Sequence, residues 1–322
     1  MMRRMEEGGA RHPRRRALVL GALVAPVLLA GCGVRLEDDA PPVPLIPSRE
    51  PLAGEDELTA LTRACVALAE LALATPGATA TALVPAHRRQ HTVLRTTLVR
   101  RGVPVEAVDG AAGPAATPSA SASGSTGRAR AAAAAVAALA DAEGSAAASV
   151  DAFADVDEEF RDTVHSLHAQ RFAAAVLLSG RAPEVAGEPV RSVAVEELAS
   201  RTQTARYFLE VVAARSTGRA RTRATTTRDA LARLLADQVA AGSAPERTMG
   251  VPLPFEVGTA AEATRLARES LDELRSAHGT RLAALRDSHG VDGWAAGTRW
   301  LGTVEAECHR WGLPLEPFPG LE

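Results

Sequence analysis

The stretch 151–178, which reads DAFADVDEEFRDTVHSLHAQRFAAAVLL, is the strongest indication of how this chain folds. Its large apolar residues recur at intervals of three to five positions, which places them on one face of an α-helix. These residues are Phe153, Val156, Phe160, Val164, Leu167 and Phe172. The pattern predicts a long helix that buries this face against other helices.

Periodicity, or for 128–149 the alanine content alone, predicts seven further helices on both sides of this stretch. They cover about 55–75, 85–101, 128–149, 193–216, 219–241, 259–288 and 291–312. Aromatic residues make up 3% of the 322, so the core must be built from Leu, Val and Ala, and alanine favours helix. Because no segment alternates as a strand does, we expect an all-α protein of antiparallel helical bundles.

Two stretches rich in small residues, proline and glycine divide the predicted helices. Residues 103–127 include PAATPSASASGSTG and predict a flexible low-complexity loop. Residues 180–192 read SGRAPEVAGEPVR, and we place a domain boundary there. The expected organisation is a helical N-terminal region over 52–180 and a four-helix domain over 193–322.

The first 31 residues have the form of a secretory signal peptide. Residues 1–16 carry six arginines and two acids, and residues 17–30 form an uncharged apolar run. This run is shorter than the roughly 20 residues of a membrane-spanning helix, which favours a cleaved signal over an N-terminal membrane anchor. The pair Arg15 and Arg16 leaves twin-arginine and general secretory export equally open.

The sequence Leu29-Ala30-Gly31-Cys32 resembles the bacterial lipobox, whose cysteine receives the lipid after cleavage of the signal. More than one acyl chain makes such an anchor stable. Residues 32–51 contain five prolines and predict an extended tether. We therefore expect a lipoprotein with Cys32 as the lipid attachment site, held at the extracytoplasmic face of the cell membrane.

The net charge of the chain argues against polyanionic partners. Removing residues 1–31 removes six Arg and two Glu, a net +4, so the formal charge of −3 becomes −7. This balance argues against non-specific nucleic-acid binding and against electrostatic docking on anionic lipid. The partners that we expect are the membrane, through the lipid anchor, and an envelope protein or small ligand.

The two cysteines beyond Cys32 lie on apolar faces of predicted helices. Outside the cytoplasm Cys65 and Cys308 could form a disulfide. The alternative is a pair of buried, unpaired thiols that behave as small hydrophobic residues.

Several sequence features resemble poorly characterised actinobacterial lipoproteins with a C-terminal ferritin-like helical domain. They are the lipobox, the tether from Arg35 to Pro51, the four helices after residue 193 with VPLPFEV between the second and third, and the closing PFPGL. The resemblance implies a ferritin-like four-helix bundle over 193–322. Ferritin-like proteins often bind two metals, through Glu residues and two Glu-x-x-His pairs.

The ligand set for such a metal centre is missing from this sequence, which has no Glu-x-x-His. A divergent centre would have to draw on Glu70, Asp162, His165, His278 or Glu305. For these we expect Glu70 to be buried in an apolar helix face, Asp162 and His165 to lie on a solvated face, and His278 to be a core histidine. Glu305 could ligate or pair with His309, and the pair His87 and His91 is expected at the surface.

No phosphate-binding loop, hydrolase nucleophile motif or cysteine pair at metal spacing is present either. We therefore expect no catalytic residues, no cofactor, no metal and no enzymatic activity. The leading hypothesis is a membrane-anchored, non-catalytic helical module with a binding or structural role at the cell envelope. The alternative is a divergent iron or manganese carboxylate protein with redox or storage activity.

Overall fold

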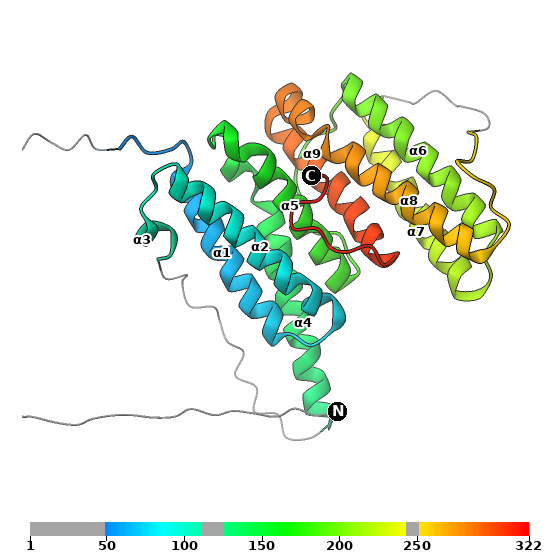
Figure 1. Cartoon of the computed structure of the whole chain (residues 1–322), viewed down its shortest axis with the longest axis horizontal. Helices are drawn as coiled ribbons and strands as arrows, with labels where there is room; N and C mark the ends of the chain where they lie inside the picture. Colours follow the sequence, from blue (N-terminus) through cyan, green and yellow to red (C-terminus); the bar gives the residue numbers. More distant parts are fainter. Residues whose placement is uncertain (1–48, 111–124, 243–250, 322) are drawn as a thin grey trace, which may run out of the picture. The chain divides into compact units, whose positions relative to one another are not determined.

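Helices are the regular elements of the computed structural model throughout the part of the chain that it describes, residues 49–110, 125–242 and 251–321 (Figure 1). They are α1 (Glu55–Ala74), α2 (Ala78–Arg100), α3 (Val105–Val108), α4 (Ser125–Ala148), the 3-10 turn η1 (Val150–Phe153), α5 (Glu158–Ser179), α6 (Val193–Ala214), α7 (Gly218–Gln238), α8 (Ala260–Gly279) and α9 (Leu282–Arg310). The all-α class is confirmed. The predicted leader, Cys32 and the tether up to residue 48 lie outside the described residues.

Helix α5 begins later than the sequence pattern predicts. Asp157 caps it, because its side chain accepts a hydrogen bond from the Glu159 backbone at 3.2 Å. The preceding residues form η1 and a turn, yet Phe153 and Val156 are still buried in the same hydrophobic cluster as Phe160. The apolar stripe was thus predicted correctly, whereas its continuous helical form before Asp157 was wrong.

Other helix boundaries also differ from the prediction. Helix α2 starts at Ala78 and accommodates Pro85 in its interior, and the predicted loop 103–127 contains the short helix α3, whose Val108 is buried. Helix α8 ends at Gly279 rather than near 288, and α9 kinks at Gly290, where φ is +54°. A left-handed φ of this kind is easily adopted by glycine alone, so the kink falls where the sequence permits it.

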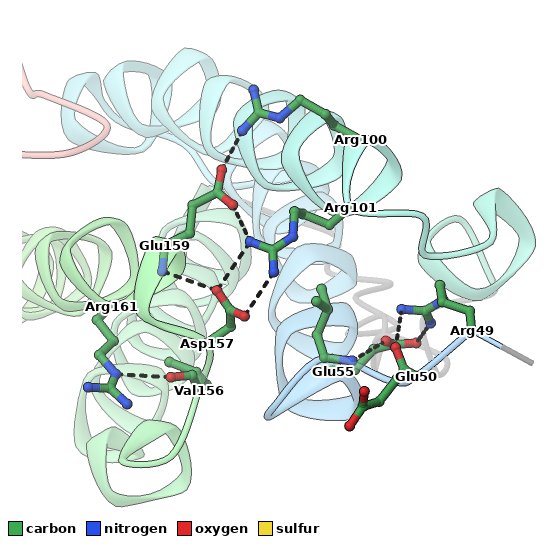
Figure 2. Close-up of polar contacts among 10 residues, drawn as sticks. Arg49, Glu50, Glu55, Arg100, Arg101, Val156, Asp157, Glu159 and Arg161 are labelled. Atoms are coloured by element: carbon green, nitrogen blue, oxygen red, sulfur yellow. Dashed lines mark hydrogen bonds and ion pairs between the residues drawn. The ribbon is translucent and has the colours of Figure 1, made fainter.

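Helices α1, α2, α4 and α5 form the first of two helix groups. The end of α2 meets the start of α5, where Arg101 Nη2 lies 3.0 Å from Asp157 Oδ2 and Arg100 pairs with Glu159 (Figure 2). The start of α1 is at the same end, because Asp157 donates its backbone N–H to the Ala53 carbonyl at 3.0 Å. Helices α1 and α5 therefore run in one direction and α2 in the other.

Helix α4 runs parallel to α2. Leu139, early in the buried part of α4, belongs to the same cluster as Leu83 of α2, and Ala147 shares a cluster with Leu98. Residues later in α4 thus lie beside residues later in α2, as expected for parallel helices. The four helices thus form two antiparallel hairpins that are joined by one long connection.

Helices α6, α7, α8 and α9 form the second group with the same order of directions. Arg281, after α8, pairs with Glu197 at the start of α6, so α6 and α8 are antiparallel. Gln238 at the end of α7 lies 3.0 Å from His278 at the end of α8, so these two helices are parallel. The end of α7 and the start of α8 therefore lie at opposite ends of the group.

The two groups meet where α5 packs against α9, the helix pair with the most extensive contact in the described residues. The helices approach closely because α9 carries Gly297 and Gly302 at the interface. A Cβ at Gly297 would lie 2.5 Å from His165 Nε2, and one at Gly302 would lie 2.7 Å from the Ala169 carbonyl oxygen. Small residues here are therefore a steric requirement.

Helix α9 belongs to both hydrophobic cores. Trp294 and Ala295 pack in the core of the first group, whereas Trp300 and Val304 pack in that of the second. The chain from Arg49 onward forms one compact unit. The domain boundary at 180–192 stays a prediction, but contacts of α9 cross it.

The C-terminal segment, residues 313–321, runs across both groups. Leu313 packs against the core of the second group, and Leu315 and Phe318 pack against clusters of the first. Gln90 of α2 donates to the Pro317 carbonyl and Ser166 of α5 to the Pro319 carbonyl, each at 2.7 Å. The segment therefore ties the two groups together.

We predict that Gly302→Ala destabilises the protein by about 1–3 kcal/mol, because the added methyl group must displace the α5 backbone. Urea unfolding followed by circular dichroism measures this loss. Thr303→Ala on the neighbouring, partly exposed position is the control, with an expected change within about 0.5 kcal/mol. Equal stability of Gly302→Ala and the wild type would contradict the close approach of α5 and α9.

Candidate functional site

Arg171 of α5 is the centre of a fully buried polar cluster in the first helix group. Its Nη1 atom lies 3.3 Å from Glu143 Oε2 of α4 and 3.0 Å from His87 Nδ1 of α2. Its Nη2 atom donates to Cys65 Sγ of α1 at 3.2 Å. Each helix of the group thus contributes one polar side chain to the cluster.

His87 links this cluster to the C-terminal segment. Its Nε2 atom lies 2.7 Å from Glu143 Oε1, and its Nδ1 atom faces both Arg171 and Gln90 Oε1, the latter at 3.1 Å. If the ring hydrogen is on Nε2, then Nδ1 accepts from the Arg171 guanidinium. The Gln90 amide group continues the network by donating to Gln170 and to the Pro317 carbonyl.

Burial and ion pairing act in opposite directions on the Glu143 carboxyl group. Burial raises its pKa, but the charge of Arg171 and the contact with His87 outweigh this effect, so the pKa is lowered overall. Burial also raises the pKa of the Cys65 thiol, and the nearby Arg171 offsets this only in part. Glu143 is therefore the anion of the cluster and Cys65 a protonated, unreactive thiol.

These properties limit the chemistry that the cluster can perform. Carboxylate, imidazole and thiol are metal-ligand types, but here they surround a guanidinium group that is always charged. A divalent cation between Glu143 and His87 would meet the positive charge of Arg171 at contact distance. The cluster is therefore built as a buried ion pair with hydrogen-bonded neighbours.

A second buried cluster lies in the other helix group around Glu305 of α9. Arg275 Nη1 of α8 lies 3.1 Å from Glu305 Oε2, and Arg275 Nη2 lies 2.7 Å from Glu316 Oε1 of the C-terminal segment. The Glu316 backbone N–H donates to Glu305 Oε1 at 2.8 Å. Burial raises the pKa of Glu305 to about 7 despite the attraction of Arg275.

The structure does not bring the candidate metal ligands together. Glu70, Asp162, His165, His278 and Glu305 lie on α1, α5, α8 and α9 in separate environments. In the part of the chain that the structure describes, no group of three or more His, Cys, Asp or Glu side chains is placed to hold a metal ion. The sequence alternative of a divergent metal centre thus has no assembled ligand set among these residues.

Three of the predicted environments were wrong. Glu70 is exposed, because α1 buries the face with Leu68 and Ala72 and leaves Leu73, beside Glu70, 67% exposed. His165 is fully buried, because α9 covers this face of α5 and its Trp294 carbonyl lies 2.9 Å from His165 Nε2. His87, expected at the surface, is in the buried cluster, whereas its partner in the predicted pair, His91, is partly exposed.

Other expectations are confirmed or replaced by different contacts. His278 is a core histidine, with Nδ1 2.9 Å from the Leu274 carbonyl oxygen, and burial lowers its pKa to about 4. Asp162 is exposed as expected, and it pairs with Arg286 of α9 at 2.9 Å. Glu305 pairs with Arg275 rather than with His309.

The disulfide alternative for Cys65 and Cys308 is not formed, and both thiols are free and buried. Cys65 lies in the core of the first helix group and Cys308 in that of the second, so their helices never place them side by side. Burial raises the pKa of the Cys308 thiol well above its usual value. The alternative of two unpaired core thiols is the one that the structure contains.

Sequence reasoning missed the centre of the first cluster, although a signal was present. Arg171 follows Leu167 by four positions and Val164 by seven, so it lies on the apolar stripe of its helix. Glu143 follows Leu139 by four positions in the same way. An arginine on one such stripe and an acid on another are the pattern of a buried ion pair.

Comparison with known proteins gives no further assignment. No protein-family model, no curated protein and no solved structure matches this chain.

We predict that Arg171→Met lowers the free energy of unfolding by about 3–5 kcal/mol, because it leaves the Glu143 carboxylate buried without its partner. The double variant Arg171→Met with Glu143→Leu should regain most of this loss, because no charge then stays buried. Arg201→Met, which breaks an exposed ion pair with Glu273, is the control and should cost less than about 1 kcal/mol. Equal losses in the single and double variants would contradict the pairing.

The raised pKa of Glu305 predicts an unusual dependence of stability on pH. A folded-state pKa of about 7 means that the folded protein holds this proton more tightly than the unfolded chain does. The contribution of Glu305 to stability is therefore fully present below its pKa in the unfolded chain, and it is lost as the pH rises through 7. Relative to Glu305→Gln, the wild type should lose roughly 3 kcal/mol between acidic and mildly alkaline pH. Parallel pH profiles of the two proteins in urea unfolding would refute this assignment.

Proposed function

We propose that the chain is an exported lipoprotein that is attached to the cell membrane through Cys32 and carries a non-catalytic helical binding module at the cell envelope. The support for the anchor is the order of basic segment, short apolar run and lipobox before the proline-rich tether. Among the described residues, no helix is long and apolar enough to cross a membrane.

For residues 193–322 we propose a ferritin-like bundle. Its support is the order of helix directions, because α7 and α8 are parallel and one long connection joins the two hairpins. A single crossover of this kind distinguishes ferritin-like bundles from simple up-and-down bundles. The first helix group has the same order of directions, which extends the proposal to a pair of similar bundles.

The placement of Arg171 is the observation that carries the non-catalytic assignment. Its guanidinium contacts both Glu143 and His87, which also pair with each other at 2.7 Å, inside the bundle where ferritin-like proteins hold their metal ions. In the second group Arg275 stands in the same way between Glu305 and Glu316. Both polar cores thus already contain their cation as a side chain.

The lipid anchor is tested by Cys32→Ser in the natural host. We expect this variant to be found in the soluble fraction after membranes are washed in high salt, whereas the wild type stays with the membrane. The expected folded body of the variant is checked by circular dichroism. Retention of the variant in washed membranes, with the leader fully removed, would contradict attachment through Cys32.

Metal analysis of protein purified from its own host tests the non-catalytic assignment. We expect far less than one iron or manganese per chain, and the same trace level in Arg171→Met, if that variant folds. Stoichiometric metal in the wild type would overturn the assignment in favour of a carboxylate metal protein.

A further inference from the structure

The turn between α6 and α7 concentrates positive charge on a chain whose average charge is negative. Residues 211–228 contain five arginines and no acid. Four of these arginines are exposed, and we call them the arginine cluster: Arg215, Arg219, Arg221 and Arg223. The net charge of the whole chain conceals this local concentration.

The nearest acids do not neutralise the arginine cluster. Glu210 on one side pairs with Arg206 at 3.6 Å, and Asp229 on the other pairs with Arg228 at 2.7 Å. Within the described residues, no carboxylate oxygen lies within ion-pair distance of the four guanidinium groups. Their charges are therefore available to an external anion.

The fold holds the arginine cluster on one end of the second helix group. Arg221 Nε donates to the Ala213 carbonyl at the end of α6 at 3.0 Å, and Arg223 lies over the ring of Trp311 at 5.3 Å. Helix α7 also begins there, with no acid in its first turn and no side-chain cap. The positive end of this helix adds to the field of the arginines.

A layer of phosphate groups matches this surface. Guanidinium groups bind phosphate oxygens through paired hydrogen bonds, and several separate contacts add together on an extended anionic surface. The polyanion that the proposed anchor brings within reach is the phospholipid surface itself.

The chain is long enough for this contact. The tether joins the body at the start of α1, next to the start of α5, and α5 runs parallel to α9, whose end carries Trp311. The arginine cluster is therefore at the far end from the tether. Residues 32–48 can extend to roughly 55–60 Å, whereas the part of α9 after its kink at Gly290 spans only roughly 30 Å.

We infer that the arginine cluster is a docking surface for anionic phospholipid headgroups, which lays the helical body against the membrane that carries its anchor. This inference rests on the proposed lipid attachment for its biological setting. The contact itself is a property of the folded body and is tested without the anchor.

The test uses the mature chain from residue 32 with Cys32→Ser, mixed at low salt with vesicles of phosphatidylglycerol or of phosphatidylcholine. We expect cosedimentation with the anionic vesicles, none with the neutral ones, and release at high salt because the charges are screened. Each arginine near an anionic surface contributes roughly 5-fold in binding. Replacing all four by glutamine should therefore weaken binding by roughly 100-fold or more.

The matched control replaces four exposed arginines of the first helix group by glutamine, which changes the net charge equally: Arg88, Arg89, Arg128 and Arg130. Its binding should stay within about 2-fold of the parent, because these side chains lie elsewhere on the molecule. If the fourfold cluster variant unfolds, Arg215→Gln with Arg219→Gln avoids the contacts to Ala213 and Trp311. That variant should still lose roughly 25-fold.

Three outcomes would overturn the inference. They are the absence of binding to phosphatidylglycerol, equal losses in the cluster and control variants, and binding to soluble polyphosphate but not to vesicles, which would assign a soluble polymer instead. The test protein carries Cys32→Ser and so has no acyl chain; if it fails to bind vesicles, the separate test of the lipid anchor at Cys32 is unaffected. Conversely, retention of the Cys32→Ser variant after the high-salt wash would contradict the anchor and not the docking surface.

Discussion

The close contact between α5 and α9 is the constraint on which the rest of the structure depends. It is possible because Gly297 and Gly302 leave room for the α5 side chains and backbone. Since α9 contributes Trp294 to one core and Trp300 to the other, this contact joins the two helix groups into one body. The same contact buries His165, which would otherwise face solvent. Loss of either glycine should therefore affect both groups at once.

Buried charge is the second organising feature of the molecule. Arg171 and Arg275 each pair with a fully buried acid, Glu143 and Glu305, in a core of Leu, Val and Ala. Such pairs contribute little net stability compared with apolar packing, but they penalise any arrangement that separates the partners. The clusters also connect to the C-terminal segment, through Gln90 in one group and Glu305 in the other. They thus help to fix how that segment crosses the two groups.

The helical pattern could be predicted from the sequence because it depends on local spacing. The stripe from Phe153 to Phe172 is buried as expected, and His278 is the expected core histidine. The environments of Glu70, His87 and His165 could not be predicted in this way. A helix with apolar residues on more than one side does not state which side its neighbours will cover. For Glu70, α1 buries the face of Leu68 rather than that of Leu73.

The sequence by itself determined the all-α class, the positions of most helices and the isolated run of arginines at 215–223, because these are properties of neighbouring residues. Tertiary structure alone decided which polar residues meet. Arg171, Glu143, His87 and Cys65 come from four helices and are brought together by packing across more than a hundred residues of chain. It also decided that Cys65 and Cys308 stay apart, since each thiol is fixed in a different core. Local spacing carries no information about such distant contacts, which depend on how the helices pack against one another.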